Sequence, residues 1–184
     1  MNLRKSVGAR LMLAFAAVIV VLGAAVVLSI SRLAAFDATV NQITGPGLAK
    51  LEITNAWIVR LLQTARHTRN MLILDDKTKI QAEVDAVAED KLKRKGYRVA
   101  LTELSSSAQE AAALQAVADL RLLYVPLEDE FLADISAGRM KEAKELLLER
   151  ARPAQLAYMD ALGKFGEFQK AQLLAKANAL SGAY

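Results

Sequence analysis

Cysteine is absent from this sequence of 184 residues, and histidine occurs once, at His67. Without cysteine, a disulfide scaffold, an iron–sulfur cluster, a thiolate zinc site and a covalently attached haem are excluded. One histidine cannot build a metal site from several imidazoles. We therefore expect neither a metal ion nor another cofactor in this protein.

Proline, glycine and aromatic residues are scarce: the chain has three prolines, nine glycines and 5% aromatic residues. So few helix breakers are atypical of a low-complexity or disordered chain. Hydrophobic residues make up 54% of the sequence, and the many alanines and leucines among them favour helices over sheets. The length suits one domain that can bury a sizeable core.

Acidic residues are missing from residues 1–32, which carry the basic residues Arg4, Lys5, Arg10 and Arg32. The whole chain has 24 basic and 20 acidic residues, so residues 33–184 carry 20 of each. A nucleic-acid-binding protein has a basic face on its folded part. The even balance of charge after residue 32 argues against nucleic acid as a partner.

Charged residues are missing from residues 11–30, which read LMLAFAAVIVVLGAAVVLSI. At about 1.5 Å per residue this segment spans about 30 Å as a helix, the thickness of the hydrocarbon core of a bilayer. The basic residues before it predict that residues 1–10 are cytoplasmic, 11–31 cross the inner membrane and 32–184 are periplasmic. The alternative is a cleavable signal peptide, whose apolar region is shorter, at about 7–15 residues.

Turn-forming residues divide the remaining sequence into four long segments with helical periodicity. We expect helices at about 48–74, 77–104, 108–136 and 140–182. The breaks before them are Gly45-Pro46-Gly47, Asp75-Asp76, Ser105-Ser106-Ser107 and Ala137-Gly138-Arg139. Because short turns make neighbouring helices antiparallel, the sequence predicts an all-α fold, an up-down-up-down four-helix bundle preceded by a transmembrane helix.

Individual residues mark the ends and irregularities of these helices. Asp76 or Thr78 is expected to cap the second helix, and Ser107 with Glu110 forms a capping box for the third. Pro126 is expected to kink the third helix and Pro153 to interrupt the fourth.

The apolar periodicity assigns an inward face to each helix. On the first two helices this face is predicted to contain Leu51, Ile58, Leu62, Ala65 and Leu72, then Ile80, Val84, Ala88, Leu92 and Val99. On the last two it includes Val117, Tyr124, Phe131, Ile135, Tyr158 and Phe165. His67 points away from the core on this assignment. Trp57 and Met71 also lie off the inward face, where lipid headgroups, a partner subunit or neither are the alternatives for contact; an exposed apolar strip of this kind is most often a dimer seam.

Basic and tyrosine side chains fall on or near the predicted inward faces. They are Arg66 and Arg69 on the first helix, Lys91 and Lys95 on the second, Arg121 and Tyr124 on the third, and Tyr158 on the fourth. Counting from the turns places Arg121, Tyr124, Lys91, Lys95 and Tyr158 within about two helical turns of one another, with Arg66 and Arg69 one to two turns further out.

Buried cations require a partner, because an unpaired buried charge costs several kcal/mol. One explanation is pairing within the protein, for example of Arg66 with Glu128 or Asp85, or extension of the side chains to the surface. The other is a bound small anion: arginine offers two parallel donors to a carboxylate, and a tyrosine hydroxyl fixes its orientation. The candidate ligand-binding residues are Arg66, Arg69, Lys95, Arg121, Tyr124 and Tyr158, and several cations favour a di- or tricarboxylate.

The order of these features resembles the N-terminal part of bacterial methyl-accepting chemotaxis receptors. The resemblance rests on basic residues, an apolar span, a Gly-Pro-Gly lead and the segment ARHTRNMLILDDK, which closes the first helix of the bundle. It implies a periplasmic four-helix-bundle sensor that forms a homodimer. It also implies control of a cytoplasmic histidine kinase and its adaptor through a C-terminal part outside this chain.

The resemblance further implies a chemoreceptor sensor region that binds a small organic acid and transmits a helix shift across the membrane. No phosphate-binding glycine loop and no metalloprotease signature is present, so we expect no enzymatic activity and no catalytic residues. Two alternatives remain: the same sensor bundle on a histidine kinase or cyclase, and a membrane-tethered structural bundle without a ligand.

Overall fold

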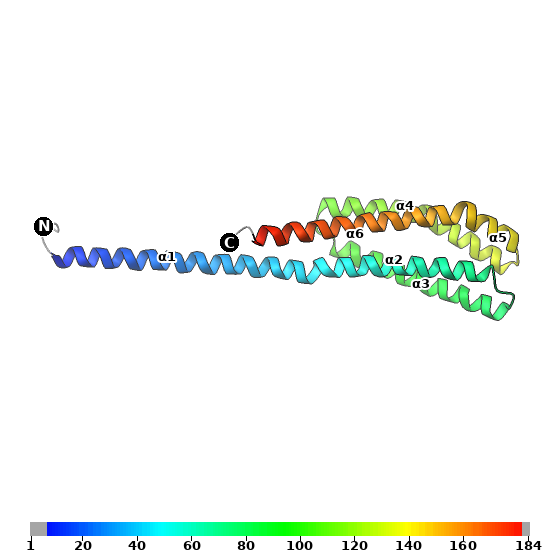
Figure 1. Cartoon of the computed structure of the whole chain (residues 1–184), viewed down its shortest axis with the longest axis horizontal. Helices are drawn as coiled ribbons and strands as arrows, with labels where there is room; N and C mark the ends of the chain where they lie inside the picture. Colours follow the sequence, from blue (N-terminus) through cyan, green and yellow to red (C-terminus); the bar gives the residue numbers. More distant parts are fainter. Residues whose placement is uncertain (1–6, 182–184) are drawn as a thin grey trace. The chain divides into compact units, whose positions relative to one another are not determined.

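The computed structural model describes the backbone of residues 7–181 and their side chains except at positions 7, 9, 35, 38, 39, 42–44, 180 and 181. Every regular element in this range is a helix (Figure 1), which confirms the predicted all-α class. Arg4 and Lys5, two of the basic residues predicted to lie in the cytoplasm, fall outside the described residues, as does position 182, where the last helix was expected to end. The chain forms two compact units, one of which is the bundle, Gly45–Ala175.

The other unit contains α1 (Val7–Gln42), the apolar helix. Residues Arg10–Ala34 of this helix are long and apolar enough to cross a membrane, by length and composition. A signal sequence near the N-terminus meets the same criterion, so the membrane anchor stays a prediction. Where a break was expected at Gly45-Pro46-Gly47, the backbone forms a π-helical turn, η1 (Ile43–Gly47). Such a turn accommodates Pro46, which has no N–H to donate.

The bundle consists of four antiparallel helical rods joined by short turns, as predicted (Figure 1). The first three rods are single helices, and the fourth is divided into two helices by a π-helical turn. In chain order the elements are α2 (Leu48–Met71), α3 (Lys77–Leu104), α4 (Ala108–Ser136), α5 (Met140–Leu146), η2 (Leu147–Ala151) and α6 (Arg152–Ser181).

Local side-chain chemistry sets the ends of these helices. The Asp76 carboxylate caps α3 by accepting hydrogen bonds from the backbone N–H groups of Thr78 and Lys79 at 2.8 and 3.2 Å. The Ser107 hydroxyl caps α4 by accepting from the Glu110 N–H at 3.1 Å. Gly138, between α4 and α5, has a φ of +74°, a conformation that only glycine adopts without strain.

The two bundle prolines behave differently. α4 continues through Pro126 without interruption. The fourth rod is interrupted, because η2 ends at Ala151 and Pro153 is the second residue of α6. A proline is tolerated in the first turn of a helix, where its missing N–H would have no partner in any case.

The inward face predicted for α2 is only partly right: Ile58 and Leu72 are half-buried and pack against the apolar core, but the fully buried positions are different ones. The buried residues recur at intervals of three and four and are Lys50, Thr54, Trp57, Leu61, Thr64, Thr68 and Met71. Leu62, predicted inward, is 52% exposed, whereas Trp57 and Met71, predicted to form a dimer seam, are 1% and 0% exposed. The apolar periodicity pointed partly to the wrong face because three threonines occupy the core side of α2 and leucines occupy the outer side.

The inward face predicted for α3 is also only partly right: Ile80 and Val84 pack against the apolar core, but polar residues occupy part of the fully buried face. The buried residues of α3 are Val87, Asp90, Arg94 and Leu101, while Leu92 and Val99 are exposed. On α4 and α6 the predicted inward residues Val117, Tyr124, Phe131, Ile135, Tyr158 and Phe165 are buried, because apolar and aromatic side chains dominate the core side there.

The core of the bundle has two apolar clusters. One contains Trp57, Leu61, Leu101, Leu114, Val117, Tyr124, Tyr158, Ala161, Leu162 and Phe165. The other lies toward the α2–α3 and α4–α5 turns and contains Met71, Val87, Phe131, Ile135, Ala143, Leu146, Leu147 and Ala151. On every rod, buried polar residues lie between the two clusters in sequence: Thr64 and Thr68 on α2, Asp90 and Arg94 on α3, Glu128 on α4, and Gln155 on α6. We call these six residues the polar layer.

Candidate anion-binding site

The centre of the polar layer is a buried ion pair between α3 and α4. Arg94 Nη2 donates to both carboxylate oxygens of Glu128, at 2.7 and 2.8 Å. The Tyr124 hydroxyl donates to Glu128 Oε1 at 3.0 Å, and Gln155 Nε2 donates to the Tyr124 hydroxyl at 3.3 Å. These bonds connect α3, α4 and α6: the Glu128 carboxylate accepts from Arg94 of α3 and Tyr124 of α4, and Gln155 of α6 joins through the Tyr124 hydroxyl.

Burial and charge shift the protonation equilibria of these groups. Burial is the largest single influence on the pKa of Arg94 and lowers it, but the charge and hydrogen bond of Glu128 act together with Tyr124 and Tyr158, and the net effect is a raised pKa. Burial, with the negative charge of Glu128, raises the pKa of Tyr124 well above its ordinary value. Burial also raises the pKa of Tyr158, against the opposing effect of the Arg94 and Arg121 charges. Both hydroxyls therefore keep their protons at neutral pH, and the arginine keeps its charge.

A pocket of about 270 Å³ opens beside Arg94, between α3, α4 and α6. We call it the cationic pocket. Its lining contains four basic side chains, one tyrosine and three apolar residues: Lys91, Arg94, Lys95, Arg121, Tyr158, Ala88, Leu92 and Val125. No acidic residue lines it.

The four cations of this pocket differ in how they are neutralised. Arg94 is paired with Glu128, and Lys91 forms an exposed ion pair with Asp129. Lys95 and Arg121 form no ion pair with any residue that the structure describes. The pocket therefore holds two positive charges that the described part of the protein does not neutralise.

The structure places three of the six predicted ligand-binding residues in the cationic pocket: Lys95, Arg121 and Tyr158. Tyr124 does not line the pocket, but its ring lies beneath the Arg94 guanidinium, with 5.9 Å between the ring centroid and Cζ. Tyr124 thus supports Arg94 and Glu128 from within the core.

Arg66 and Arg69 lie away from this pocket. Both side chains are exposed on α2, and Arg69 Nε donates to the Ala65 carbonyl of its own helix at 2.9 Å. Arg69 lines a different pocket, of about 220 Å³, between α2 and the η2–α6 part of the fourth rod, where Arg152 is the other basic residue. The structure does not bring these two arginines together with Arg121.

Two further expectations from sequence are wrong. Arg66 does not pair with Glu128, because Arg94 occupies that carboxylate; nor does it pair with Asp85, which is exposed and accepts from Gln81. His67, expected to point away from the core, is turned toward α3 and its side chain is only 15% exposed.

Sequence reasoning did not single out Arg94 as a candidate, although it forms the buried wall of the pocket. The signal was in the spacing: Arg94 follows the buried Val87 by seven residues and precedes the buried Leu101 by seven. Residues seven apart share a face of a helix in a bundle. The segment KLKRKGYR concealed this signal, because a run of charges is typical of an exposed surface.

The described part of the chain contains no group of three or more His, Cys, Asp or Glu side chains arranged to hold a metal ion. The cationic pocket itself offers only donors of positive charge and hydroxyl. Such a lining favours an anion over a cation.

Comparison with protein families gives a match over nearly the whole chain. The model of the family described as a four helix bundle sensory module for signal transduction matches residues 2–178. A comparison with curated proteins found no match. The family model covers nearly the whole chain, and its description agrees with the bundle seen here. The chain belongs to this family of four-helix-bundle sensory modules of methyl-accepting chemotaxis receptors.

Proposed function

We propose that this sensory module binds a small di- or tricarboxylate in the cationic pocket. The observation that carries the proposal is the pair Lys95 and Arg121, which have no carboxylate partner among the described residues yet lie beside the buried, charged Arg94. Arg94 is buried and Arg121 is half-buried, whereas Lys95 is exposed. Like charges repel one another most strongly where they are removed from water, and a bound anion relieves that repulsion.

We propose a role in ligand binding for three side chains of the lining. The Arg121 guanidinium can bind one carboxylate through two parallel hydrogen bonds, and the Lys95 ammonium provides a point charge for a second. The Tyr158 hydroxyl keeps its proton, since burial raises its pKa, and it can donate to a carboxylate oxygen. A volume of about 270 Å³ lies below the range of about 300–1,000 Å³ typical of drug-sized ligands, which favours a small acid.

The site is proposed to face the periplasm. α1 contains a segment with the length and composition of a membrane span, and basic residues precede it. These features support a helix that anchors the module in the inner membrane, with residues 1–10 in the cytoplasm and the bundle outside. A signal peptide would export the same bundle without the anchor, and the mass of the mature protein distinguishes the two cases.

Signalling then requires that the ligand favour one arrangement of helices over another. The cationic pocket joins α3, α4 and α6, so a ligand there can change the position of α6 relative to its neighbours. Shifts of about 1–2 Å are typical of such helix movements. We propose that this shift controls chemotaxis signalling through a kinase and its adaptor; the same module on a histidine kinase or cyclase is the alternative.

The module is also proposed to act as a homodimer, through a face different from the one expected from sequence. Exposed apolar residues recur on the outer face of α2 at Leu48, Val59 and Leu62. Positions 59, 62, 66 and 69 follow one another at intervals of three and four, so Arg66 and Arg69 share this face. Such spacing is typical of a helix that packs against another helix.

Calorimetric titration of the full chain in lipid nanodiscs with succinate, malate and citrate tests the ligand proposal. We expect Arg121→Gln to weaken binding of the preferred acid about 10–100-fold, because a charge-assisted hydrogen bond contributes about 1.5–3 kcal/mol. Lys95→Gln is expected to weaken it about tenfold. The matched control is Arg150→Gln, which removes an exposed arginine whose partner is Glu130, outside this pocket.

Equal affinity of wild type and Arg121→Gln would reject the cationic pocket as the site. If none of the three acids binds, and none raises the melting temperature of the wild-type chain with concentration, the structural bundle without a carboxylate ligand is the better description.

A further inference from the structure

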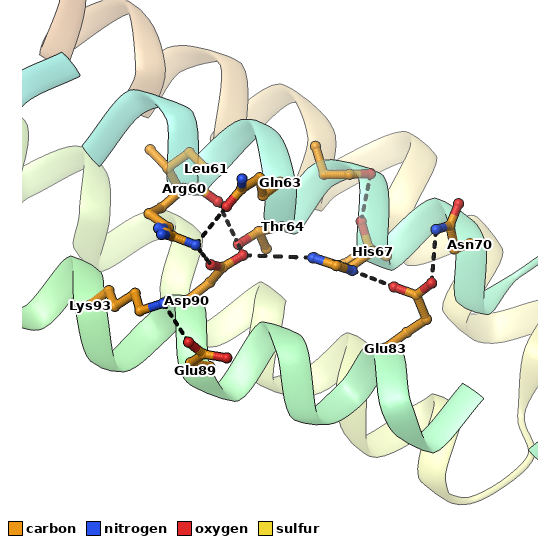
Figure 2. Close-up of polar contacts among 12 residues, drawn as sticks. Arg60, Leu61, Gln63, Thr64, His67, Asn70, Glu83, Glu89, Asp90 and Lys93 are labelled. Atoms are coloured by element: carbon orange, nitrogen blue, oxygen red, sulfur yellow. Dashed lines mark hydrogen bonds and ion pairs between the residues drawn. The ribbon is translucent and has the colours of Figure 1, made fainter. Parts of the chain in front are cut away.

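A second cluster of buried ionisable groups lies between α2 and α3, apart from the cationic pocket (Figure 2). His67 of α2 lies between two carboxylates of α3: its Nδ1 contacts Glu83, and its Nε2 is 4.0 Å from Asp90 Oδ2. The side chain of Asp90 is 4% exposed, and those of His67 and Glu83 are 15% and 20% exposed. These groups join the two helices over two turns.

The geometry favours the doubly protonated form of the imidazole. A neutral imidazole has one N–H donor and one lone pair, so with a carboxylate at each nitrogen it would turn the lone pair toward one of them. An imidazolium donates from both nitrogens. At 4.0 Å, Nε2 and Asp90 form an ion pair and not a hydrogen bond, so His67 attracts both carboxylates electrostatically only when the ring carries its second proton.

Neighbouring groups neutralise only part of the negative charge of Glu83 and Asp90. Arg60 Nη1 donates to Asp90 Oδ1 at 3.2 Å, and Thr64 Oγ1 lies 3.4 Å from Asp90 Oδ2. Asn70 Nδ2 donates to the other oxygen of Glu83 at 2.9 Å. Arg60 is the one cation bonded to these carboxylates within the described chain, apart from His67 itself.

Other charged groups around the cluster have partners or lie further out. The exposed Arg66 acts on Glu83 only through its electrostatic field. On the α4 side, the positive charge of Arg94 is taken by Glu128, and on α3 Lys93 pairs with Glu89. The hydrogen bond from His67 is the largest cause of the lowered pKa of Glu83, so this carboxylate stays charged well below neutral pH.

We propose that this module also senses protons. When the imidazole of His67 is charged, its ion pairs with Glu83 and Asp90 hold α2 against α3. As the pH rises, the ring loses a proton. Arg60 is then the only cation among the described residues that is bonded to either Glu83 or Asp90, so the packing of α2 against α3 becomes weaker. An imidazole ordinarily titrates near pH 6.5, within the range that an exported domain meets. This proposal is independent of the carboxylate site.

Because His67 is the only histidine of the chain, its ring can be observed without assignment by mutagenesis. In the full chain in nanodiscs, labelled with ¹⁵N-histidine, both ring nitrogens are expected to be protonated at pH 5.5 and one of them to lose its proton by pH 8. Over the same range, hydrogen exchange of backbone amides in residues 57–71 and 83–94, corrected for the intrinsic effect of pH, is expected to quicken at least threefold.

Two variants complete the test. His67→Gln is expected to abolish the pH dependence of exchange between pH 5.5 and 8, and Glu83→Gln to move the midpoint of the ring titration to lower pH by removing one carboxylate. A ring that does not titrate between pH 5 and 8, or a His67→Gln chain whose exchange keeps the wild-type pH dependence, would overturn the proposal. If His67→Gln does not fold, an unchanged midpoint in Glu83→Gln overturns it equally.

Discussion

At the scale of single side chains, the distinctive feature of this bundle is the burial of polar and charged residues in its core. Arg94 and Glu128 have side chains only 6% and 0% exposed, and they are bonded to each other. A buried ion pair is weak evidence for stability, since apolar residues of the same size often serve as well. Its presence at the wall of the cationic pocket supports the proposal that Arg94 contributes its charge to that site.

Neutralising one partner of this pair should be strongly destabilising. We expect Glu128→Gln to lower the free energy of unfolding by about 3 kcal/mol, the lower end of the range for a broken buried pair, because the amide still accepts a hydrogen bond. Asp129→Asn, one residue along, removes the partner of the exposed Lys91 and should cost less than about 1 kcal/mol. Urea unfolding in detergent, followed by circular dichroism, measures both; equal effects would contradict the distinction.

At the scale of the helices, glycine has opposite effects on stability: it is favourable in a turn that needs a positive φ and unfavourable in a helix interior. Gly138 joins α4 to α5 with a positive φ, whereas Gly96 lies inside α3. A Cβ atom built on either residue would meet no neighbour within 4 Å. Only the backbone conformation therefore distinguishes the two positions.

Alanine substitutions at these two glycines should change stability in opposite directions. Gly138→Ala is expected to destabilise the bundle by about 1–2 kcal/mol, the cost of a left-handed conformation for a residue with a side chain. Gly96→Ala is expected to stabilise it by about 0.5–1 kcal/mol, because alanine is the better helix former. The melting temperatures of the two variants, compared with that of the wild type, measure both effects. A higher melting temperature for Gly138→Ala would contradict the positive φ assigned to residue 138.

At the scale of the whole molecule, the bundle has a polar layer inside and an apolar strip outside. The outer face of α2 carries Val59 and Leu62, both about half exposed, while its inner face carries three buried threonines. A helix that turns apolar residues outward favours a partner on that side. This pattern supports the homodimer proposed above.

A charge placed on that strip should separate the subunits. We expect Leu62→Glu to convert a dimer into monomers without loss of helical signal. Leu122→Glu, which introduces the same change at an exposed leucine of α4, should leave the dimer intact. Light scattering of the purified full chain in detergent, corrected for the micelle, measures the mass, and a Leu62→Glu chain that stays dimeric would exclude this face as the interface.

Much of the fold followed from local chemistry that can be read along the chain. Asp76, Ser107 and Gly138 end or begin helices through their own backbone and side-chain preferences, so the turns could be predicted without knowing what packs where. The apolar segment 11–30 and the absence of cysteine are likewise properties of the sequence alone. The juxtaposition of Lys95, Arg121 and Tyr158 came from counting helical turns back from those ends.

The inward faces of α2 and α3, by contrast, were decided by tertiary structure. Thr64, Asp90 and Arg94 can be buried only because each finds a partner on another turn or another helix, and a partner across the bundle is invisible in a one-dimensional pattern. The same holds for His67, because the role proposed for it depends on the two carboxylates of α3 that lie beside it. The sequence by itself determined where the helices begin and end. Only the packing of the helices decided which polar side chains are buried, because a buried charge is stable only when a group close to it in space pairs with it.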